Sequence, residues 1–76
     1  MNHMRRKALI GIVERLIEIS FNLHDLQEDE TEYRDSIPQE DRHSEAYEQT
    51  EEAIERIEYA ICDIENAIEE IREVVQ

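Results

Sequence analysis

Residues that form turns are scarce in this chain of 76 residues, which contains one glycine and one proline. Loops draw heavily on these two residue types, so the sequence has room for very few turns. Tryptophan is absent and four aromatic side chains are spread over the whole chain. The single cysteine, Cys62, excludes an intrachain disulfide and is typical of a reducing compartment.

Basic residues are also few, with eight lysines and arginines against 21 aspartates and glutamates, which gives a net charge of −13. This charge argues against direct binding to nucleic acid or to anionic membranes, because both attract basic surfaces. It is compatible with a basic protein partner. The hydrophobic content of 39% is too low for a large core, and a chain this short rarely buries enough apolar surface alone.

Long hydrophobic runs are missing. The basic start at Arg5, Arg6 and Lys7 is followed by an apolar run over residues 8–13 that ends at Glu14. This run is too short for an export signal or a membrane span, so we expect a cytoplasmic protein without membrane contact. A Gly-rich phosphate loop and a nucleophile grouped with His and an acid are also missing, so we expect no enzyme activity and no cofactor.

What the sequence has is a seven-residue repeat over residues 47–76. Large side chains return at alternating steps of three and four, which is the spacing of a coiled-coil seam on one side of a helix. The seam positions are Tyr47, Thr50, Ile54, Ile57, Ile61, Ile64, Ile68, Ile71 and Val75.

A second seam is predicted over residues 5–36 with the same alternation of steps. Its positions are Leu9, Ile12, Leu16, Ile19, Leu23, Leu26, Glu30 and Tyr33. Pro38 disfavours helix at Ile37, so the first helix should end near Ser36, and Asp41 or Ser44 can cap the second. We therefore predict one all-α domain over residues 1–76, with helices over about 5–36 and 44–75 and a turn over 37–43.

The two seams match when the chain folds back on itself as an antiparallel hairpin. This pairing is centred on the predicted turn and sets hydrophobic seam residues of the two helices against each other. It places Leu9 opposite Ile71, Leu16 opposite Ile64, Ile19 opposite Ile61 and Leu26 opposite Ile54.

Apolar side chains outside the seams predict that the hairpin dimerises into a four-helix bundle. An extra apolar face widens the first helix, and small residues flank the second, where they allow close approach of another helix. The predicted dimer residues are Ile10, Val13, Ile17, Ala53, Ala60 and Ala67.

Three motifs match metal-site spacings without the surroundings that such sites need. Glu40 and His43 have the spacing of a di-iron ligand pair but lie in the predicted turn, and His24 with Glu28 makes only two ligands. A Glu-Glu-x-x-Glu pattern occurs twice, at residues 51–55 and 69–73, and is similar to the Mg²⁺-binding helices of all-α nucleotide pyrophosphohydrolases. The Glu-x-x-Asp motif that those enzymes also need does not follow it, so we predict solvated carboxylates rather than metal sites.

The acidic residues concentrate near the turn. Between Glu28 and Glu58 there are thirteen of them against Arg34, Arg42 and Arg56. Two interpretations stay open: a solvated polar surface, or a mimic of nucleic-acid phosphates that occupies a basic groove. The candidate partner-binding residues are Glu28, Asp29, Glu32, Asp35, Glu45, Glu48, Glu51, Glu52 and Glu55.

The dipeptides at residues 32–33, 37–38 and 44–45, together with the Glu-Glu-Ala-Ile unit at 51–54, resemble small acidic proteins of phages and mobile elements. The resemblance covers roughly residues 5–72, and those proteins are largely uncharacterised. It implies a genetic context in which small acidic inhibitors of host defence, including inhibitors of CRISPR effectors, are common.

The sequence as a whole thus predicts a non-catalytic, dimeric helical hairpin. Its expected partner is a basic nucleic-acid-binding protein. The alternative is a self-assembling structural or adaptor coiled coil.

Overall fold

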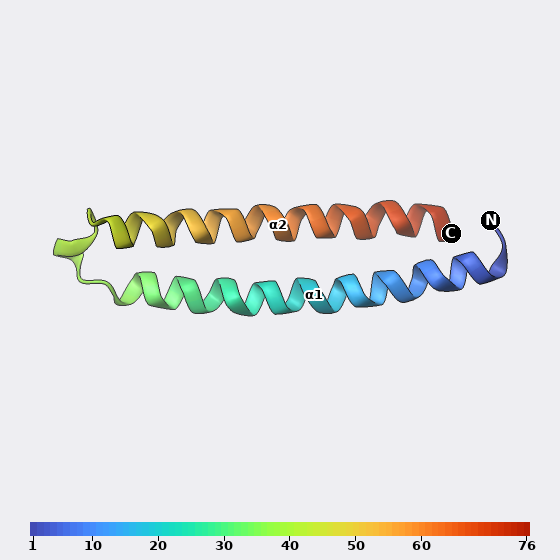
Figure 1. Cartoon of the computed structure of the whole chain (residues 1–76), viewed down its shortest axis with the longest axis horizontal. Helices are drawn as coiled ribbons and strands as arrows, with labels where there is room; N and C mark the ends of the chain where they lie inside the picture. Colours follow the sequence, from blue (N-terminus) through green and yellow to red (C-terminus); the bar gives the residue numbers. More distant parts are fainter.

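The computed structural model describes residues 1–76 as two long antiparallel helices joined by a short connection (Figure 1). Helix α1 spans His3–Ser36 and helix α2 spans Glu45–Val75, with the short 3-10 helix η1 at Gln39–Asp41 between them. The rod measures 59 × 15 × 14 Å, and both chain ends lie at the end opposite the connection. The predicted all-α hairpin is confirmed.

The ends of both helices next to the connection follow from local sequence. Ile37 has extended backbone angles (φ −71°, ψ 128°) because the following Pro38 disfavours the helical region, so α1 ends at Ser36. The hydroxyl of Ser44 accepts a hydrogen bond of 3.2 Å from the backbone N–H of Tyr47 and caps α2. These boundaries agree closely with the prediction.

Helix α2 buries the face that its repeat predicts. Thr50, Ile61 and Ile68 are buried, and Ile61 is the most enclosed large side chain of the protein at 1% exposure. The remaining seam positions of α2 are half-buried: Tyr47, Ile54, Ile57, Ile64, Ile71 and Val75.

The predicted face of α1 is wrong at three of its eight positions. Ile19, Leu26 and Tyr33 were expected in the seam, yet they are 46%, 56% and 53% exposed. The residue after each of them is buried or half-buried instead. The seam of α1 therefore still advances by alternating steps of three and four residues, but the order of the two steps is reversed. The seam of α1 consists of Leu9, Val13, Leu16, Ser20, Leu23, Gln27, Glu30 and Arg34.

The predicted pairing along the helices is displaced as well. Under that pairing Gln27 would lie beside Ala53 and Arg34 beside Ala46. Instead, their side chains contact Glu58 and Glu51, each about one helical turn further along α2. The cause is the changed face of α1, because a seam in the opposite phase meets the α2 seam at a different height.

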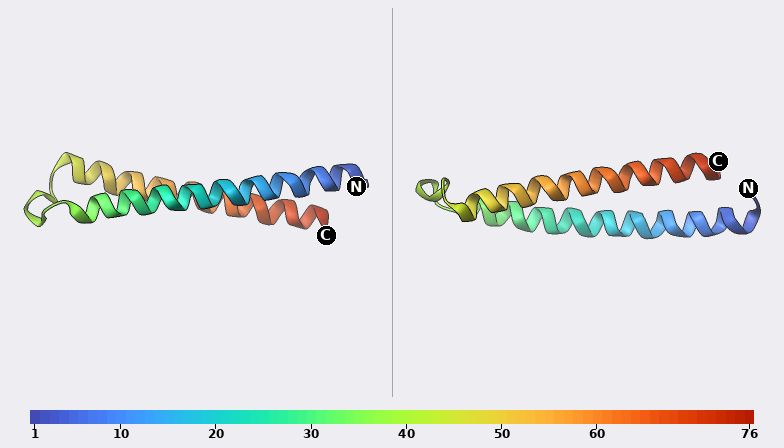
Figure 2. Two further views of the ribbon diagram at one scale, coloured as in Figure 1. Left: turned by 90° about the horizontal axis from the view of Figure 1, so that it is seen from below. Right: turned by 45° about the horizontal axis from the view of Figure 1, so that its top comes forward.

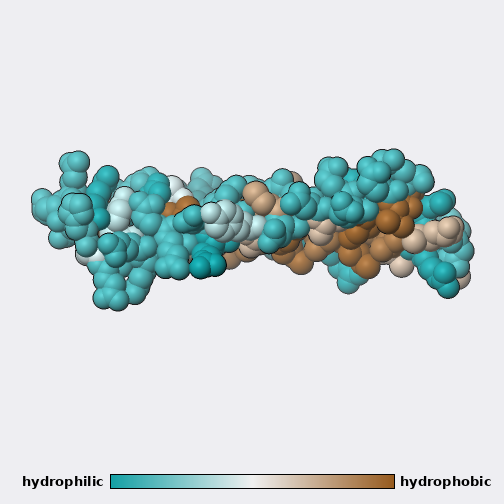
Figure 3. All heavy atoms as spheres, turned by 90° about the horizontal axis from the view of Figure 1, so that it is seen from above, coloured by the Kyte–Doolittle hydropathy of each residue, from teal (hydrophilic) through white to brown (hydrophobic).

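The core is thin. Only five of the 76 residues are buried, and two of these, Ser20 and Thr50, are polar. Figure 2 shows the helices crossing at a shallow angle, as coiled-coil packing requires. In the face shown in Figure 3, hydrophobic atoms gather on the half of the rod away from the connection, while the end with the connection is hydrophilic. Two helices alone therefore leave much apolar surface in water.

Candidate functional site

One open hollow of about 790 Å³ lies on α2 near the connection, and we call it the acidic hollow. Carboxylates make up half of its lining, and Arg42 is the only cation among the lining residues. These residues are Gln27, Arg42, Tyr47, Glu48, Glu51, Glu52, Ile54, Glu55, Glu58 and Tyr59.

The heptad repeat explains why these carboxylates lie together. Seam positions of α2 point at α1, so glutamates at the positions between them face solvent and recur every three or four residues along the same side. From Glu48 to Glu58 the helix rises about 15 Å at 1.5 Å per residue. Five carboxylates over this length give one negative charge per about 3–4 Å of helix axis.

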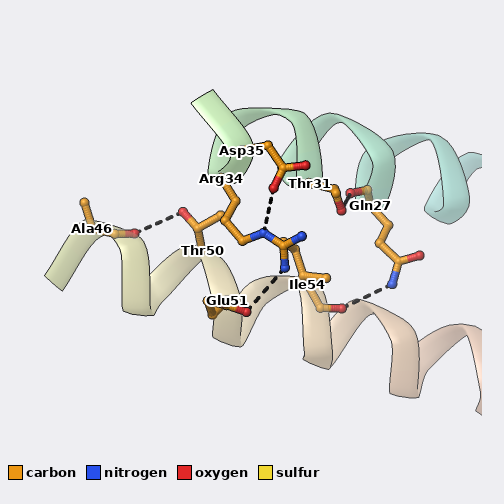
Figure 4. Close-up of polar contacts among 8 residues, drawn as sticks. All are labelled: Gln27, Thr31, Arg34, Asp35, Ala46, Thr50, Glu51 and Ile54. Carbon is orange, nitrogen blue, oxygen red and sulfur yellow. Dashed lines mark hydrogen bonds and ion pairs between the residues drawn. The ribbon is translucent and has the colours of Figure 1, made fainter. Parts of the chain in front are cut away.

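Polar contacts between the helices hold this end of the rod together (Figure 4). The side-chain amide of Gln27 donates a hydrogen bond of 3.3 Å to the carbonyl oxygen of Ile54 and another of 2.8 Å to Glu58 Oε2. A terminal guanidinium nitrogen of Arg34 donates a hydrogen bond of 3.4 Å to Glu51 Oε2. Two seam residues of α1 at this end, Gln27 and Arg34, thus hydrogen-bond across to α2.

The threonines of this region satisfy their own helices instead. Thr50 Oγ1 donates a hydrogen bond of 3.0 Å to the carbonyl oxygen of Ala46, and Thr31 Oγ1 donates one of 2.8 Å to the carbonyl oxygen of Gln27 (Figure 4). No buried side-chain polar atom is left without a partner. The polar layers therefore cost little desolvation despite replacing apolar core.

Two arginines partly compensate the carboxylates. The side chain of Arg34 is 27% exposed and also donates 3.2 Å to Asp35, and this hydrogen bond and the nearby charge of Glu51 raise its pKa. Arg42 reaches from the connection and lies 5.9 Å from the centre of the Tyr47 ring, within cation–π range. A basic side chain thus already lies against one end of the hollow.

Both tyrosines of the hollow have glutamate partners. Tyr59 donates 2.7 Å to Glu55 Oε1, and this hydrogen bond, with the negative charge of Glu55, raises the pKa of Tyr59. For Tyr47, interaction with the nearby Glu51 carboxylate has the largest effect and likewise raises the pKa. Both phenols are neutral at neutral pH, and Tyr59 is the one that donates a hydrogen bond to a carboxylate.

Tyr59 should titrate above the ordinary tyrosine pKa of about 10. The raised pKa means that the stabilisation from this contact is complete below the unfolded value and is lost as the pH rises through the higher folded value. Changing Glu55→Gln should lower the midpoint of one tyrosine in a near-ultraviolet absorbance titration, and Tyr59→Phe should remove that step. An unchanged midpoint in Glu55→Gln would show that the contact does not form in solution.

The structure brings together some of the predicted partner-binding residues and separates others. Glu48, Glu51, Glu52 and Glu55 line the hollow, whereas the other predicted carboxylates are exposed outside it: Glu28, Asp29, Glu32, Asp35 and Glu45. Asp35 accepts a hydrogen bond from Arg34, and Glu45 accepts one of 3.3 Å from Gln49. Sequence reasoning missed Glu58 and Tyr59, although both continue the spacing of three to four residues from Glu55.

The predicted dimer residues do not form one face. Val13 is buried at 7% exposure inside the hairpin, which leaves it little surface for a partner. Ile17 lines a second hollow together with His24 and Glu65, whose side chains approach to 3.8 Å. Ile10 is exposed and lies one helical heptad before Ile17 on the same side of α1.

The alanines of the predicted dimer face lie apart from this second hollow. Ala53 and Ala60 are half-buried and Ala67 is exposed. Glu65 and Ala67 flank the α2 seam on opposite sides, so the alanines lie on the other side of the hairpin from Ile17. The predicted set mixes residues of two opposite sides.

The metal-site motifs lie on exposed surface. Glu40 is in η1, His43 is in the connection, and both are exposed, as are His24 and Glu28 on α1. No group of three or more potential metal-binding side chains comes together anywhere in the protein. Cys62 is exposed, with its Sγ 4.0 Å from Glu58 Oε1.

Neither helix has a stretch that is both long and apolar enough to cross a membrane. No known protein family, no characterised protein and no solved structure shows significant similarity to this chain.

Proposed function

We propose that this chain is a non-catalytic interaction protein whose acidic hollow binds a basic protein surface, of the kind that otherwise holds nucleic acid. The observation that carries the proposal is the gathering of five carboxylates and two tyrosines into one open hollow with a single lining cation. A groove built for phosphates presents the matching lysines and arginines.

The charge spacing supports mimicry of nucleic acid. One strand of B-DNA carries one charge per about 3.4 Å of helix axis. The carboxylates of the hollow repeat at about the same interval along α2. Tyr47 and Tyr59 add phenol groups and ring faces that a partner's arginines can stack against.

The regular helical structure under the acidic hollow also favours binding. The hollow lies on a regular helix that is tied to α1 through Gln27 and Arg34, so the backbone that carries its carboxylates is held in place before binding. Binding to a preorganised surface loses less conformational entropy. We further propose that the target lies in host defence or DNA processing, such as the nucleic-acid channel of a CRISPR effector.

Two variants of equal net charge test the proposal. The hollow variant carries Glu→Gln at positions 48, 51, 52 and 55. The control variant carries Asp63→Asn with Glu→Gln at 69, 70 and 73, all exposed on α2 outside the acidic hollow. Wild type and both variants are immobilised, incubated with nuclease-treated host-cell extract, and eluted with a salt gradient and with excess double-stranded DNA.

We expect wild type and control to retain a nucleic-acid-binding protein that DNA displaces, and the hollow variant to retain at least tenfold less. Release should be complete by about 0.5 M salt, where the Debye length is about 4 Å. Equal retention by the two charge-matched variants would show that only the overall charge matters and would overturn the proposal. Circular dichroism of both variants confirms that the helices persist.

A second candidate function, a self-assembling structural or adaptor protein, is favoured by the exposed apolar side chains Ile19, Leu26 and Tyr33 on α1. Under this alternative, both charge variants behave as wild type, and polar substitution of the apolar positions abolishes all associations.

A further inference from the structure

The two sides of the hairpin differ in chemistry. Each helix of a coiled coil has one row of flanking positions on either side of its seam. In an antiparallel coiled coil, equivalent rows of the two helices face each other across the same side of the hairpin. On one side, Ile17 and His24 of α1 meet Glu65 and Arg72 of α2 around the second hollow, and His24 lies 3.8 Å from Glu65. On the opposite side of the hairpin, the remaining flanking positions of α1 therefore face the remaining flanking positions of α2.

The flanking positions on that opposite side carry no charged residue over most of their length, and we call this row of positions the apolar flank. Positions of this type usually carry Glu or Lys when a coiled coil faces water. Four large side chains come from α1 and three small ones from α2, each set repeating every seven residues. The apolar flank consists of Ile12, Ile19, Leu26, Tyr33, Ala53, Ala60 and Ala67.

The surface area indicates how far the single hairpin is from a compact shape. A compact protein of 9.1 kDa exposes about 4,900 Å². The hairpin exposes 5940 Å². The surplus is about 1,000 Å² per chain, or about 2,000 Å² for two copies, which is the area that a stable dimer interface buries.

The flank matches a second copy of itself. The midpoint of the large residues on α1 lies between Ile19 and Leu26, and the midpoint of the small residues on α2 is Ala60. The contacts of Gln27 with Glu58 and of Arg34 with Glu51 place these two midpoints within about 4 Å of the same height along the rod. One twofold axis can therefore pass through both midpoints, as a self-complementary interface requires.

The charge distribution selects the orientation. Thirteen acidic and three basic residues lie between Glu28 and Glu58, whereas Arg5, Arg6, Lys7 and Arg15 lie near the chain ends. Two copies with their connections at the same end would bring both acidic regions together. With the connections at opposite ends, each acidic region lies beside the less acidic end of the partner, so repulsion is smaller.

We propose that two copies associate through the apolar flank into a four-helix bundle with their connections at opposite ends. Helix α2 then packs on α2 of the partner through the small residues, and α1 packs on α1 through the large ones. Small side chains allow the α2 helices to approach closely. This interface leaves the acidic hollow free, so it does not depend on the proposed function.

The first test measures mass by sedimentation equilibrium. Wild type should have twice the 9.1 kDa chain mass at micromolar concentration. Leu26→Glu, on the flank, should raise the dimer dissociation constant at least 100-fold. Phe21→Glu, which is 65% exposed but away from the flank, should leave it within threefold of wild type. A monomeric wild type, or a Leu26→Glu protein that dimerises like wild type, would overturn the proposal.

The second test fixes the orientation and does not depend on a destabilised variant. In a Cys62→Ser background, Ala60→Cys places a thiol next to the proposed twofold axis, and Asn66→Cys places one on the outer surface of α2. Under mild oxidation, the chain with cysteine at 60 should form a disulfide-linked dimer at least tenfold faster than the chain with cysteine at 66. Equal rates, or a dimer that links only at 66, would contradict the arrangement.

Discussion

Ile61→Glu is expected to unfold the protein. Ile61 is 1% exposed, so a carboxylate at this position would be buried without a partner. An uncompensated buried charge costs about 3–5 kcal/mol. A chain of this length has a total stability of about 4–11 kcal/mol at 0.05–0.15 kcal/mol per residue, so the loss removes a large part of it. Thermal melting followed by circular dichroism should show most of the helical signal lost near room temperature.

Phe21→Glu is the matched control for this change. It introduces the same charge in place of a large apolar residue, but at a position that is 65% exposed. Its carboxylate remains hydrated, so the free energy of unfolding should change by less than about 1 kcal/mol. If Ile61→Glu melted within a few degrees of Phe21→Glu, Ile61 would not lie in the core.

Added NaCl is expected to stabilise the protein, and the melting temperature should rise by about 10 °C between 10 mM and 0.5 M. The net charge of −13 is confined to a rod of 59 × 15 × 14 Å, which unfolding allows to spread apart. Salt shortens the Debye length from about 30 Å to about 4 Å over this range and removes most of the repulsion. Relief of about 2 kcal/mol corresponds to this shift for a domain of this size.

The ion pairs of the structure act against this effect but are weak. Arg34–Glu51 and Arg56–Glu52 have N–O distances of 3.4 and 3.7 Å and lie at or near the surface, where such pairs contribute at most about 1 kcal/mol. The hollow variant with four Glu→Gln changes should be more stable at low salt and should respond less to NaCl. A melting temperature that falls with salt would show that ion pairs, rather than repulsion, dominate the stability.

The boundaries of the helices could be predicted because they depend on neighbouring residues. Pro38 restricts Ile37, and Ser44 caps α2 through its own hydroxyl. The buried face of α2 could be predicted as well, since its seam contains isoleucines at nearly every position while the other positions are mostly charged. There, only one face is apolar enough to be buried.

The face of α1 could not be predicted because two faces compete. Ile19 and Leu26 are more hydrophobic than their neighbours Ser20 and Gln27, so hydrophobicity alone selects the wrong phase. The structure buries Ser20 and lets Gln27 reach the carbonyl oxygen of Ile54 and Glu58. Such contacts depend on where α2 lies, and a pattern within one helix does not contain that information.

The candidate site shows the same division. The spacing of Glu48, Glu51, Glu52 and Glu55 along one helix was readable from the sequence, since it depends on helical periodicity alone. None of the acidic residues of α1 that were predicted to bind a partner lines the hollow, because Gln27 is the only residue of α1 there. Which carboxylates of two helices share one side depends on the rotation of each helix about its own axis.

The sequence by itself determined two helices, their ends, the turn, the face of α2 and an acidic region, because each of these follows from local backbone preferences or from periodicity within one helix. Only the tertiary structure decided which side of α1 meets α2, how far the helices are displaced along each other, and therefore which carboxylates line one hollow and which apolar side chains stay exposed. Hydrophobic burial has no direction, and α1 offers two competing apolar faces, so burial alone does not fix which of the two meets α2. Side-chain contacts across the two helices, such as those of Gln27 and Arg34, select one of them.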